Sequence, residues 1–539
     1  MRISNGRIFL LLIFLYSCAL QRNPEGGAKD ITPPEVISTS PENFATNFSG
    51  HDIELQFDEY IALNDIGNQL VISPLLTYAP EIKIRKKSIL IHLKDTFLEN
   101  TTYTFNFGDG IMDNNEGNKL SNYQFVFSTG PVIDSLTISG KVQHAFTGAT
   151  EKGILAQLYH KTDDSIPMVE RPVYFARTND SGYFTIRNIS PGEYKIIALQ
   201  ESDANYLYTP GNESIGYLDS AVAAGTEGLQ MKLFREIPAV RFMRAYSEFP
   251  GKSVLIFNQP ADTITWKYLN DSTALDLYAI HYSPKKDTVT LWYRNLSTDS
   301  LSLQFENTIE KDTVILRLFK RHEDKDEKKK FALALSSGLS KLAKQTVFMP
   351  FRIESNHPLV SVDTGSIVLL EDSSPVKPLI QFADSMHLQI LVNYDWKEKT
   401  GYSLLIPKGS IRDIYGVTND TTEFTFSTNS EADYGSVKIS YLDEAADPYV
   451  VQLIDDAGNV YRQFESSKTK EITYNHLLPR VYRIKLFRDD NKNGIWDTGE
   501  YLKHKQPEEV VYYPEGITVR ANWDVEITIR PKALTSKKP

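Results

Sequence analysis

The stretch "TTYTFNFGDGIMDNNEGNKLSNYQFVFSTG" (residues 101–130) contains two alternating segments separated by a turn. Large apolar residues occupy every second position, with Tyr103 and Phe105 before the turn and Phe127 after it. A period of two places one face of a strand in a core and the other face in solvent. Gly, Asp and Asn fill the middle of the stretch, and these residues favour turns. The stretch therefore predicts two antiparallel, half-buried strands.

The same alternation recurs along almost the whole chain, for example in "HDIELQFDEY" (51–60) and "KSILIHLKD" (87–95). Short runs rich in β-branched and aromatic residues, separated by Asn, Asp, Gly and Pro, are typical of antiparallel sandwiches. We therefore expect an all-β protein built as a tandem array of β-sandwich domains. The clearest helical candidate is "LALSSGLSKLAKQ" (333–345), but Gly338 interrupts its leucine spacing, and a strand or a loop fits this segment equally well.

Length and charge limit the classes of function. The chain has 539 residues, of which 41% are hydrophobic and 24% charged, so it can bury several cores. A domain size of about 150 residues gives roughly three to five domains. The formal net charge of −11 argues against a nucleic-acid partner, which requires a basic face to neutralise phosphates. We expect no nucleic acid among the partners.

The first residues have the features of a secretory signal peptide. Two arginines surround a short polar start, and the apolar run "IFLLLIFLYSC" (8–18) ends at Cys18, the only cysteine of the chain. The run is too short to span a bilayer comfortably. Residues 1–17 are therefore predicted to be a signal peptide, and the polar residues 18–31 a tether that precedes the first domain.

The end of the apolar run resembles a bacterial lipobox. Leu15 and Ser17 stand three positions and one position before the cut, and Cys18 would receive the lipid. This resemblance implies a membrane anchor at Cys18, made durable because each buried CH2 adds about 0.8 kcal/mol of membrane affinity. Ala19 resembles the residue found in lipoproteins sorted to the outer membrane of gram-negative bacteria, and the lack of a strongly acidic run after Cys18 favours the periplasmic face over the cell surface. The alternative is an ordinary signal peptide with an incidental cysteine.

Residues 32–130 and 346–430 are similar to each other and predict two copies of one module. Ile111–Asp113 corresponds to Ile411–Asp413, and "VFST" in the first copy corresponds to "TFST" in the second. The first copy resembles the SbsA-like bacterial Ig-like domain, and the second copy is a divergent member that lacks the double proline. The residues that carry the resemblance are Pro33, Pro34, Ser40, Pro41, Phe57 to Ile61, Leu98 to Phe105 and Ile111 to Thr129.

A second internal repeat links residues 136–235 with residues 434–532. Tyr194 and Tyr482 occupy equivalent positions after a proline, and the first copy contains "SGYFTI" and "PGEYKI". These motifs resemble the carboxypeptidase-regulatory or transthyretin-like β-sandwich, which implies that fold for both copies. Residues 237–345 are rich in predicted strands but match neither repeat, so they are an unassigned β domain.

The segment "DDNKNGIWDTGE" (489–500) has the spacing of an EF-hand calcium loop, with oxygen-bearing residues at positions 1, 3, 5, 9 and 12, a backbone carbonyl at position 7, and Gly494 at the sharp turn. The preceding "VYRIKLFR" alternates like a strand, so the segment is not a helix-opening sensor. A structural calcium site with weak affinity, in the range of about 0.1 to 1 mM, is therefore expected. The predicted ligands are Asp489, Asn491, Asn493, Ile495 through its backbone, Asp497 and Glu500.

An Asx-rich turn without metal is the alternative, because Asn and Asp favour such turns by themselves. The equivalent loop of the earlier repeat keeps Glu201, Asp203 and Asn205 but has Tyr206 where glycine is needed. A tyrosine adopts left-handed backbone angles at a cost, so we expect this earlier loop to have lost the site.

No motif in the sequence argues for catalysis, since HExxH, GxSxG, a Gly-rich phosphate loop and paired cysteines are all missing. The carboxylates near Asp58 and Asp113 could form an acid–base pair, but strand ends and turns collect such residues. The expected function is a non-catalytic cell-envelope lipoprotein that acts as a scaffold or interaction subunit for other envelope proteins at the outer membrane. The alternative is a surface adhesin or a glycan-binding lipoprotein, with a glycan as the ligand.

Overall fold

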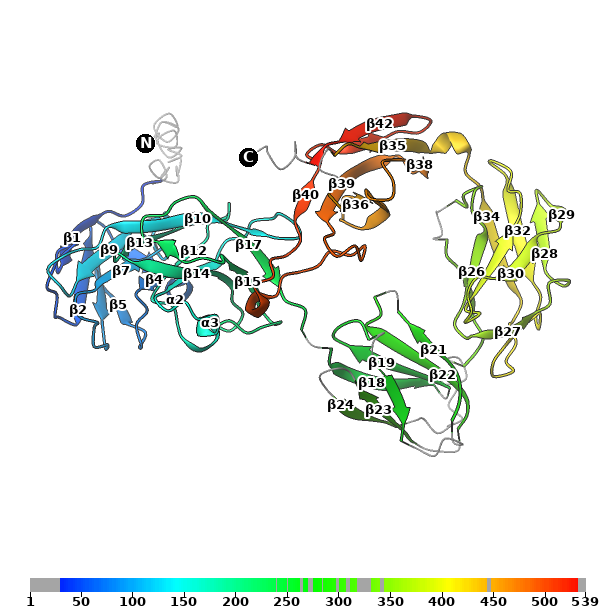
Figure 1. Ribbon diagram of the computed structural model, residues 1–539, viewed down its shortest axis with the longest axis horizontal. Helices are drawn as coiled ribbons and strands as arrows, with labels where there is room; N and C mark the ends of the chain where they lie inside the picture. Colours follow the sequence, from blue (N-terminus) through cyan, green and yellow to red (C-terminus); the bar gives the residue numbers. More distant parts are fainter. Residues whose placement is uncertain are drawn as a thin grey trace, which may run out of the picture. The chain divides into compact units, whose positions relative to one another are not determined.

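The contacts within the chain divide it into two compact units. Figure 1 shows the strands and short helices in their order along the chain. Unit 1 comprises Met1–Val142, Thr150–Leu207 and Tyr217–Met231, and unit 2 comprises Gln143–Ala149, Tyr208–Gly216 and Lys232–Pro539. The computed structural model describes residues 30–238, 240–249, 251–261, 265–269, 275–283, 285–296, 300–306, 311–317, 331–339, 344–443 and 447–531.

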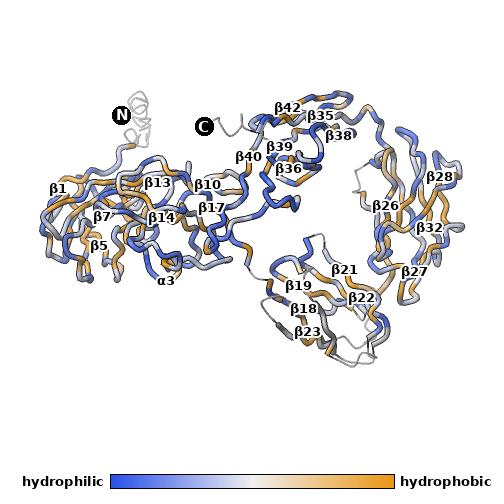
Figure 2. Tube along the Cα trace, in the orientation of Figure 1, coloured by the Kyte–Doolittle hydropathy of each residue, from blue (hydrophilic) through white to orange (hydrophobic). Residues whose placement is uncertain are grey.

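Regular structure in these segments is almost entirely strand, which confirms the all-β prediction. Hydrophobic and hydrophilic residues alternate along the strands, as the sequence pattern requires (Figure 2). In the described segments, no helix has the length and apolar character needed to span a bilayer. The short helical turns there are α2 (Ile66–Gln69), α3 (Ile166–Val169), η3 (Glu431–Asp433) and η4 (Tyr501–Lys503).

The first sandwich belongs to unit 1. Its sheets have the orders β1-β2-β6-β5 and β4-β7-β9, and β3 pairs with β8 as a short ribbon. The alternating side chains of both sheets meet in one core, in which Phe57, Phe105 and Phe127 are fully buried. The strands are β1 (Val36–Ser40), β2 (Asp52–Phe57), β3 (Ile61–Leu63), β4 (Val71–Ser73), β5 (Glu81–Arg85), β6 (Ser88–His92), β7 (Thr102–Asn106), β8 (Ile111–Asp113) and β9 (Gln124–Ser128).

The second sandwich follows directly. Its strands form one continuous hydrogen-bonded path, β12-β11-β14-β15-β17-β10-β13, and β16 also pairs with β14. Ile138, Phe184 and Ile196 are among its buried apolar side chains. The strands are β10 (Leu136–His144), β11 (Leu155–Tyr159), β12 (Tyr174–Arg177), β13 (Tyr183–Ile189), β14 (Glu193–Gln200), β15 (Ser214–Tyr217), β16 (Val222–Ala223) and β17 (Leu229–Arg235).

The third sandwich begins the larger part of unit 2. It pairs the sheet β18-β19-β22-β21 with the sheet β20-β23-β24, around a core that includes Leu255, Val289 and Leu303. The strands are β18 (Phe242–Phe249), β19 (Lys252–Phe257), β20 (Thr265–Tyr268), β21 (Leu275–Tyr282), β22 (Thr288–Leu296), β23 (Ser300–Glu306) and β24 (Lys311–Arg317).

The fourth sandwich has the strand order of the first with one strand added, β29, at the edge of its second sheet. Its sheets are β25-β26-β31-β30 and β29-β28-β32-β34, and its ribbon is β27-β33. The candidate helix at 333–345 does not form in the described residues of that segment. Leu335 instead pairs with Ser355 across β25 and β26, because period-two pairing on a sheet edge outweighs leucine spacing broken by Gly338. The strands are β25 (Leu335–Ser337), β26 (Phe351–Ser355), β27 (Leu359–Val362), β28 (Val368–Glu371), β29 (Ser374–Val376), β30 (Leu379–Phe382), β31 (Gln389–Asn393), β32 (Gly401–Ile406), β33 (Ile411–Asp413) and β34 (Thr422–Ser427).

The fifth sandwich packs the sheet β38-β35-β42 against the sheet β37-β36-β39-β40, and β41 pairs with β39. Its first and last strands, β35 and β42, pair in parallel from Ser436↔Asp524 to Tyr441↔Ile529. The strands are β35 (Gly435–Tyr441), β36 (Tyr449–Ile454), β37 (Val460–Glu465), β38 (Glu471–Leu477), β39 (Arg480–Arg488), β40 (Val510–Tyr512), β41 (Ile517–Val519) and β42 (Asp524–Ile529).

Candidate functional site

The predicted calcium loop follows strand β39, and its own side chains hold its backbone. The Asp489 carboxylate is 3% exposed and accepts the backbone N–H groups of Asn493 and Gly494 at 3.0 and 2.9 Å. The side-chain oxygen of Asn491 accepts the N–H of Asn493 at 3.1 Å, and that of Asn493 accepts the N–H of Ile495 at 2.7 Å. The loop is therefore a series of interleaved Asx turns.

The remaining predicted ligands are arranged less uniformly. The Asp497 carboxylate contacts the side-chain amides of Asn491 and Asn493. Glu500, in contrast, forms an ion pair with Lys503, with 2.5 Å between Oε2 and Nζ. In the described part of the chain, no three side chains of His, Cys, Asp or Glu converge closely enough to hold a metal ion. A cation at this loop would therefore also need amide and carbonyl oxygens, which the Asn residues and the backbone of Ile495 offer.

Glu508 is a residue of this loop region that the sequence analysis did not identify. Its carboxylate accepts the backbone N–H groups of Asp490 at 3.1 Å and Asp497 at 2.9 Å, although it lies beyond the twelve-residue pattern. Burial raises the pKa of Glu508, and the nearby charges of Asp497 and Asp489 raise it further. Glu508 thus adds a further carboxylate to those of Asp489, Asp497 and Glu500 around the loop.

The earlier repeat copies the shape of this loop closely. Tyr206 has a φ of 66° where Gly494 has a φ of 76°, so the tyrosine adopts the left-handed conformation that we expected to be costly. The N–H of Tyr206 donates to Glu201, just as the N–H of Gly494 donates to Asp489. The same turn geometry therefore forms on two different sets of side chains.

The second half of the 489–500 loop is anchored inside unit 2. The Thr498 hydroxyl donates a hydrogen bond of 2.8 Å to the carbonyl of Arg235. Gly499 is required at this contact, because a Cβ there would lie 2.6 Å from the ring of Phe234. Tyr501, which follows the loop, is completely buried. The loop is therefore packed on one side and is not a free surface hairpin.

Cys18, the predicted lipid attachment residue, lies outside the described residues. The carboxylates considered above for acid–base chemistry accept backbone hydrogen bonds, Asp113 within a turn and Asp58 at the end of β2. Asp113 accepts the N–H groups of the four residues from Asn115 to Asn118, at distances of 2.6 to 3.1 Å. Asp58 accepts the N–H of Glu35 at 2.8 Å. These contacts match the interpretation of the two carboxylates as strand-end and turn residues.

A buried aromatic cluster joins the third and fourth sandwiches within unit 2. Phe249, Trp292 and Ile414 form its buried centre. The hydroxyl of Tyr415 donates a hydrogen bond of 2.7 Å to the carbonyl of Gly251, across 164 residues of sequence. A Cβ at Gly251 would lie 2.5 Å from the tyrosine ring, so the two chain segments touch without any gap.

The same joint contains a fully buried histidine and aspartate. The Nδ1 atom of His357 lies 2.6 Å from Oδ2 of Asp413, and both side chains are completely shielded from solvent. The other carboxylate oxygen of Asp413 accepts the N–H groups of Tyr415 and Val417 at 2.9 and 2.8 Å. The ring of Phe249 packs 5.0 Å from the imidazole. Asp413 therefore fixes both the turn and the histidine that fills the joint.

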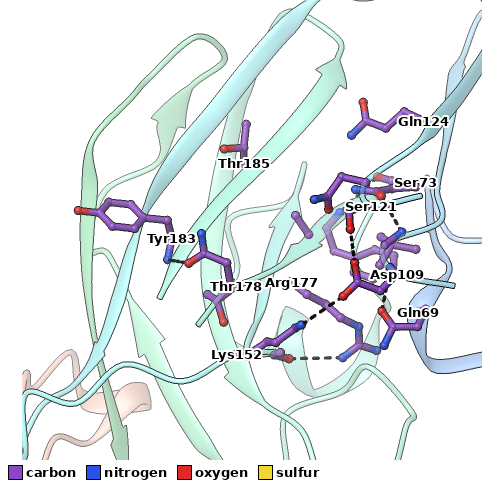
Figure 3. A pocket seen from close by; sticks show the side chains of 18 of the residues that line it. Gln69, Ser73, Asp109, Ser121, Gln124, Lys152, Arg177, Thr178, Tyr183 and Thr185 are labelled. Atoms are coloured by element: carbon purple, nitrogen blue, oxygen red, sulfur yellow. Dashed lines mark hydrogen bonds and ion pairs between the residues drawn. The ribbon is translucent and has the colours of Figure 1, made fainter. Parts of the chain in front are cut away.

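A polar cleft of about 970 Å³ lies in unit 1, where the first and second sandwiches meet (Figure 3). Outward-facing residues of β7 and β9, such as Asn106 and Gln124, line one wall, and Thr185 and Arg187 of β13 line the other. The joint beneath is closed by a hydrogen bond of 2.9 Å between the Asn188 amide and the Thr104 hydroxyl. The cleft was not foreseen from the sequence.

Charged groups at one end of the cleft are largely satisfied by the protein (Figure 3). The Asp109 carboxylate accepts a hydrogen bond of 2.8 Å from Ser121 and lies 3.9 Å from Nζ of Lys152. The Arg177 guanidinium donates to the carbonyl of Gly153 at 3.3 Å. The exposed residues of β13 that line the cleft, Tyr183, Thr185 and Arg187, are not part of the Asp109–Lys152 ion pair. The cleft therefore has one end with several charges and a wall on which Arg187 is the charged residue.

Residues 30–129 match the family described as Bacterial Ig-like domain, which confirms the prediction of such a domain at the start of the described chain. No curated protein matches the sequence. Among solved structures, the Bacillus anthracis TIE protein is similar at 10% identity, covering 98% of this chain and 79% of that one, with a TM-score of 0.14. The major pilin subunit of Bacillus cereus is similar at 11% identity, covering 74% and 99%, with a TM-score of 0.14. The surface-layer protein SbsC, domains 1 to 6, is similar at 9% identity, covering 87% and 67%, with a TM-score of 0.14.

Proposed function

We propose that this protein is a non-catalytic lipoprotein of the bacterial cell envelope, anchored through Cys18 and acting as a scaffold for other envelope proteins. The bacterial Ig-like domain at residues 30–129 supports a bacterial surface or structural role. The lipobox-like sequence before Cys18 supports the anchor, and Ala19 supports the outer membrane. The periplasmic face is the proposed location.

The observation that carries the scaffold role is the construction of two joints, one between the first and second sandwiches and one between the third and fourth. Flexible arrays join their domains through exposed linkers with few crossing contacts. Here, the Tyr415 hydroxyl of the fourth sandwich donates a hydrogen bond to the Gly251 carbonyl of the third, next to the buried His357–Asp413 pair. A joint filled by buried, hydrogen-bonded groups resists bending, because any bend exposes those groups or breaks their bonds.

The joint between the first and second sandwiches is built in the same way. The Thr102 hydroxyl donates to the Asp134 carboxylate at 3.0 Å, and the N–H of Asp134 donates back to that hydroxyl at 2.9 Å. The N–H of Phe175 donates to the Ser73 hydroxyl at 3.3 Å. The first and second sandwiches, like the third and fourth, are thus held together by direct contacts, and a scaffold needs such joined surfaces to position its partners.

We further propose that the loop at 489–500 binds calcium as a structural clip. The spacing of Asp489, Asn491, Asn493 and Asp497 supports this role, together with the backbone carbonyl of Ile495 and the carboxylate of Glu500. The loop is already shaped by its own Asx turns, so a bound ion would add stability and would not create the fold. No calcium-driven opening is proposed, because the loop extends from a strand.

The scaffold role is tested by in-cell crosslinking of the full-length protein, followed by affinity purification from the outer-membrane fraction and mass spectrometry. We expect a reproducible, stoichiometric set of envelope proteins. The matched control is Cys18→Ala, which should move the chain out of the membrane fraction and lose that set. An anchored, abundant protein that captures no partner in repeated experiments would contradict the scaffold role. Retention of lipid labelling in Cys18→Ala would contradict the anchor.

A further inference from the structure

The wall of the cleft in unit 1 is made by strand faces that should point to solvent. Along β13, Tyr183, Thr185 and Arg187 alternate with the buried Phe184 and Ile186, so the three occupy one outer face. At about 3.3 Å per residue, this row is roughly 13 Å long. This length exceeds that of a single sugar ring or similar small molecule, so the row can contact an extended ligand at several points.

The opposite wall continues the same chemistry. Asn106 of β7 pairs directly with Gln124 of β9. Thr104 lies two residues before Asn106 on the same face of β7. Amide groups both donate and accept hydrogen bonds, and hydroxyls do the same. Within the described segments, the side chains of Gln124, Thr185 and Arg187 form no hydrogen bond or ion pair with the protein. These three groups are therefore available to a ligand.

The charges of the cleft argue against an anionic ligand. Lys152 and Asp109 neutralise each other, and Arg177 is engaged with a backbone carbonyl. The lining as a whole carries three cations, Lys152, Arg177 and Arg187, and two anions, Asp109 and Asp180, so its net charge is only +1. Phosphate-rich ligands need a clear excess of positive charge, which this cleft lacks. An apolar ligand would need apolar walls, and the strand faces here present amides and hydroxyls.

We infer that this cleft binds a neutral oligosaccharide through the free side chains of Gln124, Thr185 and Arg187. Sugar hydroxyls are both donors and acceptors, so they match amides, hydroxyls and the planar guanidinium of Arg187. Tyr183 is 53% exposed at the edge of the cleft away from Gln69 and Asp109 (Figure 3). Nζ of Lys141 lies over one face of its ring, 5.2 Å from the centroid, so the C–H groups of a sugar would stack on the opposite face. A volume of about 970 Å³ is at the upper end of the roughly 300 to 1,000 Å³ of ligand pockets and suits several sugar rings.

This inference is independent of the scaffold role, because it concerns a ligand of unit 1 and not the envelope partners. The test is isothermal titration of the full-length protein with maltotetraose, cellotetraose, mannotetraose and tetra-N-acetylchitotetraose. We expect saturable binding of at least one of these sugars with a Kd of about 1 mM or tighter. Arg187→Ala and Gln124→Ala should each weaken that binding by about tenfold or more, since each removes hydrogen bonds to the ligand.

The matched control is Arg85→Ala, which removes an exposed guanidinium from β5 in the same unit, away from the cleft. It should leave the Kd unchanged. Because the three substituted positions are on strand surfaces, the thermal unfolding of each variant should coincide with that of the parent. The inference is overturned if none of the four sugars binds, or if Arg187→Ala and Gln124→Ala bind as tightly as Arg85→Ala. Binding of inorganic pyrophosphate that depends on Arg187, without sugar binding, would also overturn it and indicate an anion site.

Discussion

Replacing Asp413 by alanine should destabilise the fourth sandwich by about 4 kcal/mol. The substitution removes two hydrogen bonds from backbone N–H groups and the contact with His357, all made by a side chain that is fully buried. Each bond to a charged group contributes about 1.5 kcal/mol or more, and breaking a buried pair costs roughly 3 to 5 kcal/mol. The loss is large because Nε2 of His357 already has no hydrogen-bond partner among the described residues, so the variant leaves the whole imidazole unsatisfied.

Hydrogen–deuterium exchange with mass spectrometry on the full-length chain measures this locally. Peptides that cover β27 and β33 should exchange almost a thousandfold faster in Asp413→Ala, since each 1.4 kcal/mol is a factor of ten. The matched control is Asp420→Ala in the same sandwich, which breaks an ion pair with Lys408. The side chain of Asp420 is 85% exposed and that of Lys408 is 73% exposed, so the loss should cost less than about 1 kcal/mol. If both variants change the exchange by the same small factor, the buried pair does not stabilise the joint and the reasoning is wrong.

Three further predictions concern other parts of the chain. Gly251→Ala should lower the stability of the joint by about 2 kcal/mol or more, because φ is +114° and the new Cβ would lie 2.5 Å from the Tyr415 ring; unchanged denaturant midpoints would contradict this. Burial raises the pKa of Asp113, but its four backbone N–H donors outweigh burial and hold that pKa below its usual range. The carboxylate therefore stabilises the first sandwich above its unfolded pKa of about 3.9 and loses this contribution as the pH falls through its folded pKa. The melting temperature should accordingly fall in acid less for Asp113→Asn than for the parent, and parallel curves would exclude the effect. Titration with millimolar calcium should give heat that disappears in Asp489→Ala and persists in Asp203→Ala; a chain that gives no heat would remove the calcium site.

The strands were predictable because each sandwich buries one face of every sheet. Tyr103 and Phe105 had to alternate with polar residues once their sheet covered a core, and the printed sequence shows that alternation directly. The segment at 333–345 was harder, since leucine spacing and strand pairing compete there and only the partner strand β26 decides the outcome. Pairing partners far along the chain leave no local signal.

The candidate sites were predictable only where one segment supplies them. The spacing from Asp489 to Asp497 identified the loop, but Glu508 reaches it from beyond the pattern and was missed. Alternation puts Thr185 and Arg187 on an outer face of β13, but it gives no sign that the first sandwich faces them. Tyr206 shows a different limit, since side-chain hydrogen bonds hold it in a backbone conformation that its residue type disfavours.

The parallel pairing of β35 with β42 has a mechanical consequence. The chain enters the fifth sandwich at one end of this strand pair and leaves it at the opposite end, from Ser436↔Asp524 to Tyr441↔Ile529. A force that pulls the two ends apart therefore acts along the strands and loads their hydrogen bonds together in shear, whereas an antiparallel hairpin would open one bond at a time. The sandwich can thus carry tension without a disulfide, which the chain cannot form within itself because Cys18 is its only cysteine.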